Sequence, residues 1–218
     1  MPYFKEFDLL FIHIPKTGGS IIENFFYTKL SLFKTIDTLY SSKHNFVNDK
    51  LIKIDSNNHS LQHTSYNEIF SSKKNYFNIK FSNLKILSLV RSPYSRIISS
   101  LFYFNLIDLE SCNKNQIEKI ITKYLYTDNF YDNSKKPQYL YLTGGDNLTI
   151  PKNIIIIKNE TMTTDMVKYG YDDFKNYNIN PFDNEIDYMS YLSENAISMI
   201  NHYYFMDFKL FDYEPIVN

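Results

Sequence analysis

Residues 11–26 read FIHIPKTGGSIIENFF, an apolar run followed by a lysine, two glycines and a hydroxyl residue. The run starts earlier, as FDLLFIHI over residues 7–14, and it ends at Pro15, which is typical of a buried strand. Behind the glycines, four apolar residues recur at three-to-four spacing, which predicts a helix with one apolar face. These four are Ile21, Ile22, Phe25 and Phe26. The stretch therefore predicts a strand, a glycine-rich loop and a helix.

The same order returns twice along the chain. The run LKILSLV over residues 84–90 is followed by Arg-Ser-Pro and a second helical pattern, in which Ser92 suits the N-cap and Pro93 the first helical position. The run NIIIIK over residues 153–158 precedes a polar helix start at residues 160–166. Continuous apolar runs that alternate with helices predict an α/β fold, with a central, mainly parallel sheet flanked by helices in three layers. A closing helix is predicted over residues 193–211.

Composition limits the kind of protein this can be. With 218 residues and 44% hydrophobic content, we expect a single domain over residues 1–218. The formal charge of -1, from 23 basic and 24 acidic residues, predicts no attraction to nucleic acid or to anionic membranes, so an anion site must be built locally. Cys112 is the sole cysteine, which excludes an intrachain disulfide and a cysteine-based metal site. No apolar run reaches the roughly 18 residues of a membrane span, and the first residues do not resemble a signal peptide, so we expect a cytoplasmic protein without a membrane segment.

The loop PKTGGS, residues 15–20, has the composition of an anion site. In open α/β sheets, ligands bind beyond the carboxyl ends of the strands, where a glycine-rich turn offers backbone N–H groups and a helix dipole. Lys16 adds a mobile charge, and Thr17 and Ser20 add hydroxyl groups. The lysine precedes the glycines, whereas the nucleotide-kinase P-loop reads G-x-x-x-x-G-K-[ST], a pattern that the chain lacks. The alternative is a simple strand-to-helix turn with a solvated lysine.

A second candidate anion site follows the second predicted strand. Arg91 offers a planar fork for a phosphate, and Ser99 lies eight residues on, where a helical side chain leans back toward the helix N-terminus. Arg96 lies on the same helix, and we expect it to be a solvated or ion-paired surface side chain.

Together, HIPKTGGS and LVRSPYSRIISSLF resemble the 5′-phosphosulfate and 3′-phosphate binding motifs of the PAPS-dependent sulfotransferases (PAPS is 3′-phosphoadenosine 5′-phosphosulfate). The closest resemblance is to the family 2 type, the branch with heparan and other carbohydrate O-sulfotransferases. Further stretches follow that branch in order: LQHTSYNEIF, PQYLYL, IIIIKNETM and NHYYFMDFKLFDY. Relatives often carry asparagine where this chain has Ser92, and arginine where it has Lys158.

The resemblance implies a P-loop-like fold and a residue-by-residue site. It implies that Lys16, Thr17, Gly18, Gly19 and Ser20 wrap the 5′-phosphosulfate of PAPS, and that Arg91 and Ser99 hold its 3′-phosphate. Lys16 would also stabilise the bridging oxygen, where negative charge grows as the product PAP departs. No metal is required in this scheme, because these side chains and the backbone donors already supply the positive field.

His63 is the predicted general base. It lies in a QH-x-x-x-x-E pattern that resembles the family segment with the catalytic histidine, and imidazole titrates near neutral pH. Glu68 either orients that imidazole or caps a helix, and we prefer the second interpretation. His13 is expected to be a packed core residue, and it is the next candidate for the base.

The sequence is thus interpreted as a PAPS-dependent O-sulfotransferase that acts on a hydroxyl, with a carbohydrate as the favoured acceptor. One alternative is a phosphoryl-transfer enzyme on a related core, which the order of the lysine and the lack of a clear Mg²⁺-binding carboxylate after residue 158 disfavour. The other alternative is a non-catalytic nucleotide- or glycan-binding protein on the same fold.

Overall fold

The structure is a computed structural model that describes residues 3–30, 61–71, 84–108, 112–127, 134–146, 148–177 and 187–217. The chain divides into two compact units, and each has a hydrophobic core of its own. The first unit comprises residues 1–90 and 138–178, and the second comprises residues 91–137 and 179–218. The expectation of one domain over the whole chain stays a prediction.

A four-stranded sheet forms the centre of the first unit, with the strand order β1-β2-β3-β4. The strands are β1 (Tyr3–Phe4), β2 (Leu9–Ile12), β3 (Lys85–Val90) and β4 (Ile154–Lys158). β2, β3 and β4 are parallel, and β1 pairs with β2 in the antiparallel sense. The predicted mainly parallel sheet is confirmed, and each of its three parallel strands lies within a run that the sequence indicated. β1 was not predicted, because two residues are too few to show a periodic pattern.

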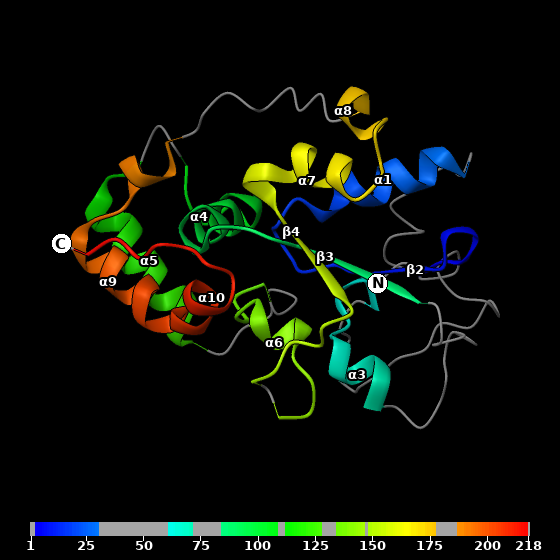
Figure 1. Cartoon of the computed structure of the whole chain (residues 1–218). Helices are drawn as coiled ribbons and strands as arrows, with labels where there is room; N and C mark the ends of the chain where they lie inside the picture. The colour runs from blue at the N-terminus through cyan, green and yellow to red at the C-terminus, as the bar shows by residue number, and fades with distance from the viewer. Residues whose placement is uncertain are drawn as a thin grey trace. The chain divides into compact units, whose positions relative to one another are not determined.

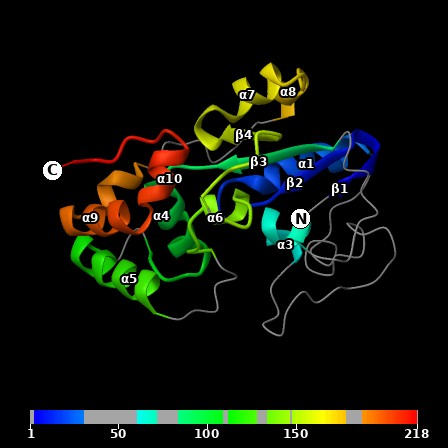
Figure 2. The same cartoon turned by 60° about the horizontal axis from the view of Figure 1, so that its bottom comes forward.

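Helices cover both faces of this sheet (Figures 1 and 2). On one face, α1 packs with α7 and α8 in a core that includes Phe11, Phe26, Leu87 and Phe174. On the other face lie α3 and α6. The bounds of the helices in this unit are η1 (Lys5–Phe7), α1 (Gly19–Lys29), η2 (Leu61–His63), α3 (Tyr66–Ser71), α6 (Tyr139–Leu142), η4 (Asn159–Thr161), α7 (Met162–Lys168) and α8 (Phe174–Tyr177). The flanking helices complete the predicted three layers.

The register of the sheet decides which loops lie close together. Ile12 pairs with Ser88, and Ser88 pairs with Ile156, so the carboxyl ends of β2 and β4 reach the same edge. Ser88 strengthens this register, because its buried hydroxyl donates a hydrogen bond of 2.8 Å to the carbonyl oxygen of Ile12. His13 and Asn159, which follow these two strands, therefore lie at the same edge of the sheet.

The described part of the second unit is helical. Its helices are α4 (Pro93–Tyr103), α5 (Lys114–Tyr126), η5 (Tyr188–Tyr191), α9 (Glu194–Tyr203) and α10 (Phe205–Leu210). The core includes Ile98, Leu101, Ile121 and Ile200 from α4, α5 and α9. α4 begins as predicted, with Ser92 at the N-cap position and Pro93 as its first residue. None of the helices in the described ranges of the chain is long and apolar enough to cross a membrane.

The prediction of one continuous closing helix is wrong. The helix is interrupted at Tyr204, which has φ -104° and ψ 23° and separates α9 from α10. Tyr204 is buried, and its hydroxyl donates a hydrogen bond of 3.0 Å to the carbonyl oxygen of Lys135. The apolar periodicity runs through this point, so the sequence pattern did not show the break.

The prediction for Arg96 is also wrong, because this side chain is buried and only 1% exposed. Its guanidinium donates to the carbonyl oxygens of Ser134 and Lys136 at 2.8 to 3.1 Å. The guanidinium carbon also lies 5.9 Å from the centre of the Tyr204 ring. These carbonyl groups offset the cost of desolvating the charge, and their position depends on a segment about 40 residues away in sequence.

Candidate functional site

The glycine-rich loop leaves β2 and enters α1 through two left-handed residues. Lys16 has φ 65° and Gly18 has φ 90°. Left-handed geometry at a residue with a side chain costs roughly 1–2 kcal/mol, so the fold holds Lys16 in a strained conformation. Such turns make successive backbone N–H groups converge, and α1 begins directly at Gly19. A glycine-rich turn in front of a helix N-terminus is the arrangement that anion-binding loops use.

Neither glycine of the loop has room for a side chain. A Cβ on Gly18 would lie 2.6 Å from Nδ2 of Asn159, and a Cβ on Gly19 would lie 2.5 Å from Cδ2 of His13. Asn159 is close because its Nδ2 donates a hydrogen bond of 3.0 Å to the carbonyl oxygen of Thr17, which ties the loop to the end of β4. The loop is thus held in place by Asn159, which follows β4, and by His13, which follows β2.

The three polar side chains of the loop differ in exposure. Lys16 is half-buried and Ser20 is exposed. Thr17 is fully buried, and its hydroxyl donates a hydrogen bond of 2.9 Å to the carbonyl oxygen of Ile14. The hydroxyl proton of Thr17 is therefore used inside the loop, which leaves the backbone N–H as the donor that Thr17 can offer to an anion.

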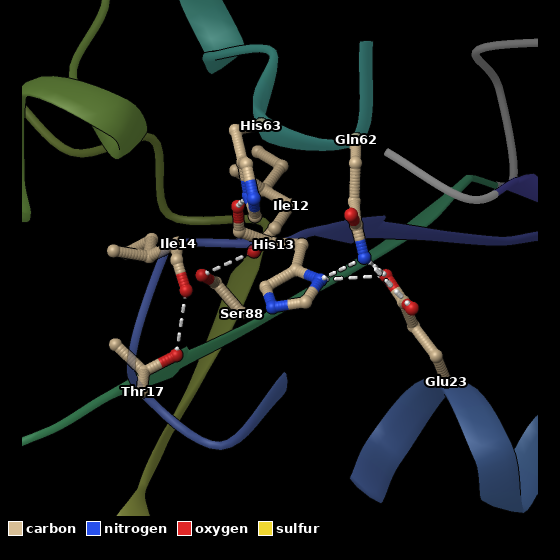
Figure 3. Close-up of polar contacts among 8 residues, drawn as sticks. All are labelled: Ile12, His13, Ile14, Thr17, Glu23, Gln62, His63 and Ser88. Atoms are coloured by element: carbon tan, nitrogen blue, oxygen red, sulfur yellow. Dashed lines mark hydrogen bonds and ion pairs between the residues drawn. The ribbon is translucent and has the colours of Figure 1, made fainter. Parts of the chain in front are cut away.

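A buried polar cluster lies behind the loop (Figure 3). His13 is 4% exposed and Glu23, on α1, is 1% exposed. Nδ1 of His13 lies 2.6 Å from Oε1 of Glu23. Gln62 of η2 completes the cluster, because its Nε2 donates to both carboxylate oxygens of Glu23 at 3.1 Å and lies 3.1 Å from Nδ1 of His13. His13 is buried as expected, but its ring lies in a polar network.

His63 of η2 is bonded to the backbone at the start of the loop. Its Nδ1 lies 2.9 Å from the carbonyl oxygen of His13, and the two rings meet edge to face with centroids 4.8 Å apart (Figure 3). A carbonyl oxygen only accepts, so Nδ1 carries the hydrogen, and Nε2 of the neutral ring carries none. Burial, and then the neighbouring His13, hold the pKa of His63 well below its ordinary value. Both effects favour the neutral form of the imidazole.

Glu68 caps α3. Its Oε2 accepts hydrogen bonds from the backbone N–H of Ser65 at 2.7 Å and from the Ser65 hydroxyl at 2.6 Å. The Glu68 N–H lies 3.4 Å from the same hydroxyl, which completes a reciprocal arrangement at the helix start. The preferred interpretation of Glu68 agrees with these contacts.

Arg91 and Ser99 belong to the second unit. The Nε of Arg91 donates to the hydroxyl of Ser95 at 3.0 Å, and its Nη2 donates to the hydroxyl of Tyr188 at 2.7 Å. The guanidinium carbon also lies 5.0 Å from the centre of the Tyr188 ring. Ser95 and Ser99 are four residues apart on α4, so they share a face of that helix, and both are half-buried. These contacts fix the plane of the guanidinium.

The predicted residues are thus divided between the units. Lys16 to Ser20 lie together with His63 in the first unit, and Arg91 with Ser99 lies in the second. Sequence reasoning missed five contact residues: Glu23, Gln62, Ser95, Asn159 and Tyr188. Glu23 had a usable signal, since a carboxylate next to Ile22 on the apolar face of α1 must find a partner once it is buried. No sequence pattern indicates the contacts that the other four make.

Searches of curated proteins and of solved structures find no significant match. A model of the sulfotransferase family matches residues 3–190, which include both anion-site motifs and the segment with His63. That match spans well over half of the chain and confirms the resemblance stated from the sequence. The chain belongs to the sulfotransferase family.

Proposed function

We propose that this protein is a PAPS-dependent O-sulfotransferase that moves the sulfuryl group of PAPS to a hydroxyl acceptor, with a carbohydrate as the acceptor class. Family membership supports sulfuryl transfer in general. The two motifs support PAPS as the donor, and the branch that they resemble supports a carbohydrate acceptor. The observation that carries the proposal is the contact of 2.9 Å between Nδ1 of His63 and the carbonyl oxygen of His13, just before the glycine-rich loop.

The loop is assigned to the phosphosulfate end of PAPS. Support comes from the left-handed turns at Lys16 and Gly18 and from the helix start at Gly19. A close approach of the backbone to an anion needs this geometry. Lys16 is assigned to the bridging oxygen, where a positive charge stabilises the departing PAP.

Arg91 and Ser99 are assigned to the 3′-phosphate. Support comes from the orientation of the guanidinium, whose Nε and Nη2 are held by Ser95 and Tyr188. An oriented guanidinium loses less side-chain freedom when it binds a phosphate in bidentate fashion. Ser99 adds a hydroxyl from α4, the helix that also carries Ser95.

His63 is assigned to the acceptor. In the proposed reaction, Nε2 of His63 takes the proton of the acceptor hydroxyl while the acceptor oxygen bonds to sulfur. The bond between sulfur and the bridging oxygen breaks, and its electron pair leaves with PAP. A base whose neutral form dominates at working pH is ready for this proton. The low pKa of His63 favours that form.

The test combines binding with transfer. Calorimetric titration with PAP, ATP with Mg²⁺, and adenosine 5′-phosphosulfate measures donor preference, and labelled PAPS with a panel of oligosaccharides, peptides and small alcohols measures transfer. We expect PAP to bind most tightly and label to reach an oligosaccharide. Tighter binding of ATP would favour the phosphoryl-transfer alternative. PAP binding without transfer to any acceptor would favour a non-catalytic protein.

A further inference from the structure

Two separate contacts join η2 to the segment around the glycine-rich loop. The first is the hydrogen bond from His63 Nδ1 to the carbonyl oxygen of His13. The second is the pair of hydrogen bonds from Gln62 Nε2 to the carboxylate of Glu23. Gln62 and His63 are adjacent residues, so the two contacts hold one short turn at two points (Figure 3).

Glu23 is the centre of this arrangement. Its carboxylate is buried and receives hydrogen bonds from His13 on one side and from Gln62 on the other. Hydrogen bonds to a buried carboxylate are charge-assisted and are stronger than neutral ones. Glu23 also lies on α1, four residues after Gly19, so the helix that follows the glycine-rich loop also carries the anchor of η2.

The geometry points to Glu23 and Gln62 as positioning residues that hold η2 against the His13 carbonyl and so fix His63 as the Nδ1–H tautomer. This inference rests on the proposed function of His63, whose Nε2 must be unprotonated to act as a base. A histidine in water carries its proton mostly on Nε2, so the useful tautomer has to be imposed by the partner of Nδ1. The His13 carbonyl imposes it only while η2 stays in place.

The cluster also positions His13, a buried histidine to which the proposed reaction assigns no role. Nδ1 of His13 faces Glu23 and Gln62, and its Nε2 side faces Gly19, where an added Cβ would lie 2.6 Å away. His13 is thus held between α1 and η2, and its backbone carbonyl is held with it. The side-chain contacts of His13 thus fix the position of its carbonyl oxygen, which accepts the hydrogen bond from Nδ1 of His63.

The tautomer can be measured directly by long-range ¹H–¹⁵N correlation on full-length protein with ¹⁵N-labelled histidine. The resonances of His63 are assigned by their loss in His63→Gln, and the spectra are recorded at about pH 8, where imidazole is neutral. We expect native protein to show His63 with the hydrogen on Nδ1. In Gln62→Met, which keeps the side-chain length and removes the donor, we expect a large fraction of Nε2–H.

Turnover should follow the tautomer. For Gln62→Met we expect turnover to fall on the order of tenfold, a part of the roughly 10²-fold worth of a positioned base. PAP affinity should change less than about twofold, because the hydrogen bonds of Gln62 go to Glu23, which is not among the residues assigned to PAPS. Glu23→Gln keeps the shape of the side chain and removes its charge, so it should show an intermediate tautomer ratio and an intermediate turnover. If Gln62→Met does not fold, Glu23→Gln tests the positioning role by itself.

The matched control is Glu68→Gln, which loosens the cap of α3 in the same segment without touching the cluster. It should keep the native tautomer and native turnover. A folded Gln62→Met or Glu23→Gln with the native tautomer overturns the positioning role. A shifted tautomer with unchanged turnover leaves the positioning role in place and refutes His63 as the base, so the two failures are distinguishable.

Discussion

The imidazole of His13 occupies the space that a side chain on Gly19 would need: an added Cβ would lie 2.5 Å from Cδ2 and 2.6 Å from Nε2 of the ring. The ring is buried and bonded to Glu23 at 2.6 Å, so it has little freedom to move aside. Gly19 is therefore required by packing, since no left-handed φ is needed at this position.

We predict that Gly19→Ala destabilises the protein by about 1–3 kcal/mol, the usual cost of overpacking, and weakens PAP binding. Chemical denaturation and calorimetry measure the two effects. Gly144→Ala is the matched control, because a Cβ at Gly144 meets nothing within 4 Å. Native stability and native PAP affinity in Gly19→Ala would show that the ring moves freely.

Lys16→Ala should lower turnover by on the order of 10²-fold and weaken PAPS binding much less. A charge that acts on the departing oxygen matters more in the transition state than in the ground state. Alanine keeps a Cβ at the left-handed position, so the backbone cost is matched and the comparison isolates the charge. Single-turnover rates and PAPS titration test this. Lost affinity with normal turnover would reduce Lys16 to a binding group.

Arg91→Ala should weaken PAP binding by about 2 kcal/mol or more, because it removes a charge-assisted bidentate contact. Adenosine 5′-phosphosulfate lacks the 3′-phosphate, and its binding should barely change. Tyr188→Phe removes the hydroxyl 2.7 Å from Nη2 and keeps the ring, so it should give a smaller loss with the same ligand pattern. Equal losses for both ligands would contradict the assignment of Arg91.

His63→Gln should reduce sulfate transfer by roughly 10²-fold or more and leave PAP affinity nearly intact. The native rate should decline in acid only well below pH 6.5, about the ordinary pKa of histidine, because burial and His13 lower the pKa of His63. The variant should lack that decline. A folded, PAP-binding variant with near-native turnover would eliminate His63 as the base.

The same low pKa predicts a pH dependence of stability. Below about pH 6.5 the unfolded chain binds a proton at residue 63 and the native state does not, so acid favours unfolding through this group. Native protein should therefore lose more unfolding free energy than His63→Gln as the pH falls from about 7 toward the native pKa of His63, and the difference should level off below it. Urea titrations across this range measure it. Parallel pH profiles for the two proteins would mean that the pKa of His63 is not lowered in the folded state.

The three parallel strands of the first unit, and the loop and helix that follow β2, were readable from local sequence. Unbroken apolar runs such as LKILSLV form parallel strands because both faces of each strand are covered, and the pattern of α1 follows from one buried face. The loop between β2 and α1 was recognisable because its left-handed position and its crowded position both require glycine, and a pair of glycines is visible in the sequence. His63 was identified by a resemblance; it lies beside the loop, and its role as the base stays a prediction.

Tertiary structure alone decided the partners of these residues. The pairing of Gln62 with Glu23 spans 39 residues and that of Asn159 with Thr17 spans 142, and no periodic pattern encodes contacts over such separations. Burial of Arg96 depended likewise on where distant carbonyl groups came to lie. The sequence thus determined which chemical groups stand at the ends of the strands, because strand and loop formation are local. Which hydrogen-bond partner each group meets, and hence the tautomer and pKa of His63, was decided by packing, because only the folded chain removes water from these groups and brings the remote donors and acceptors to them.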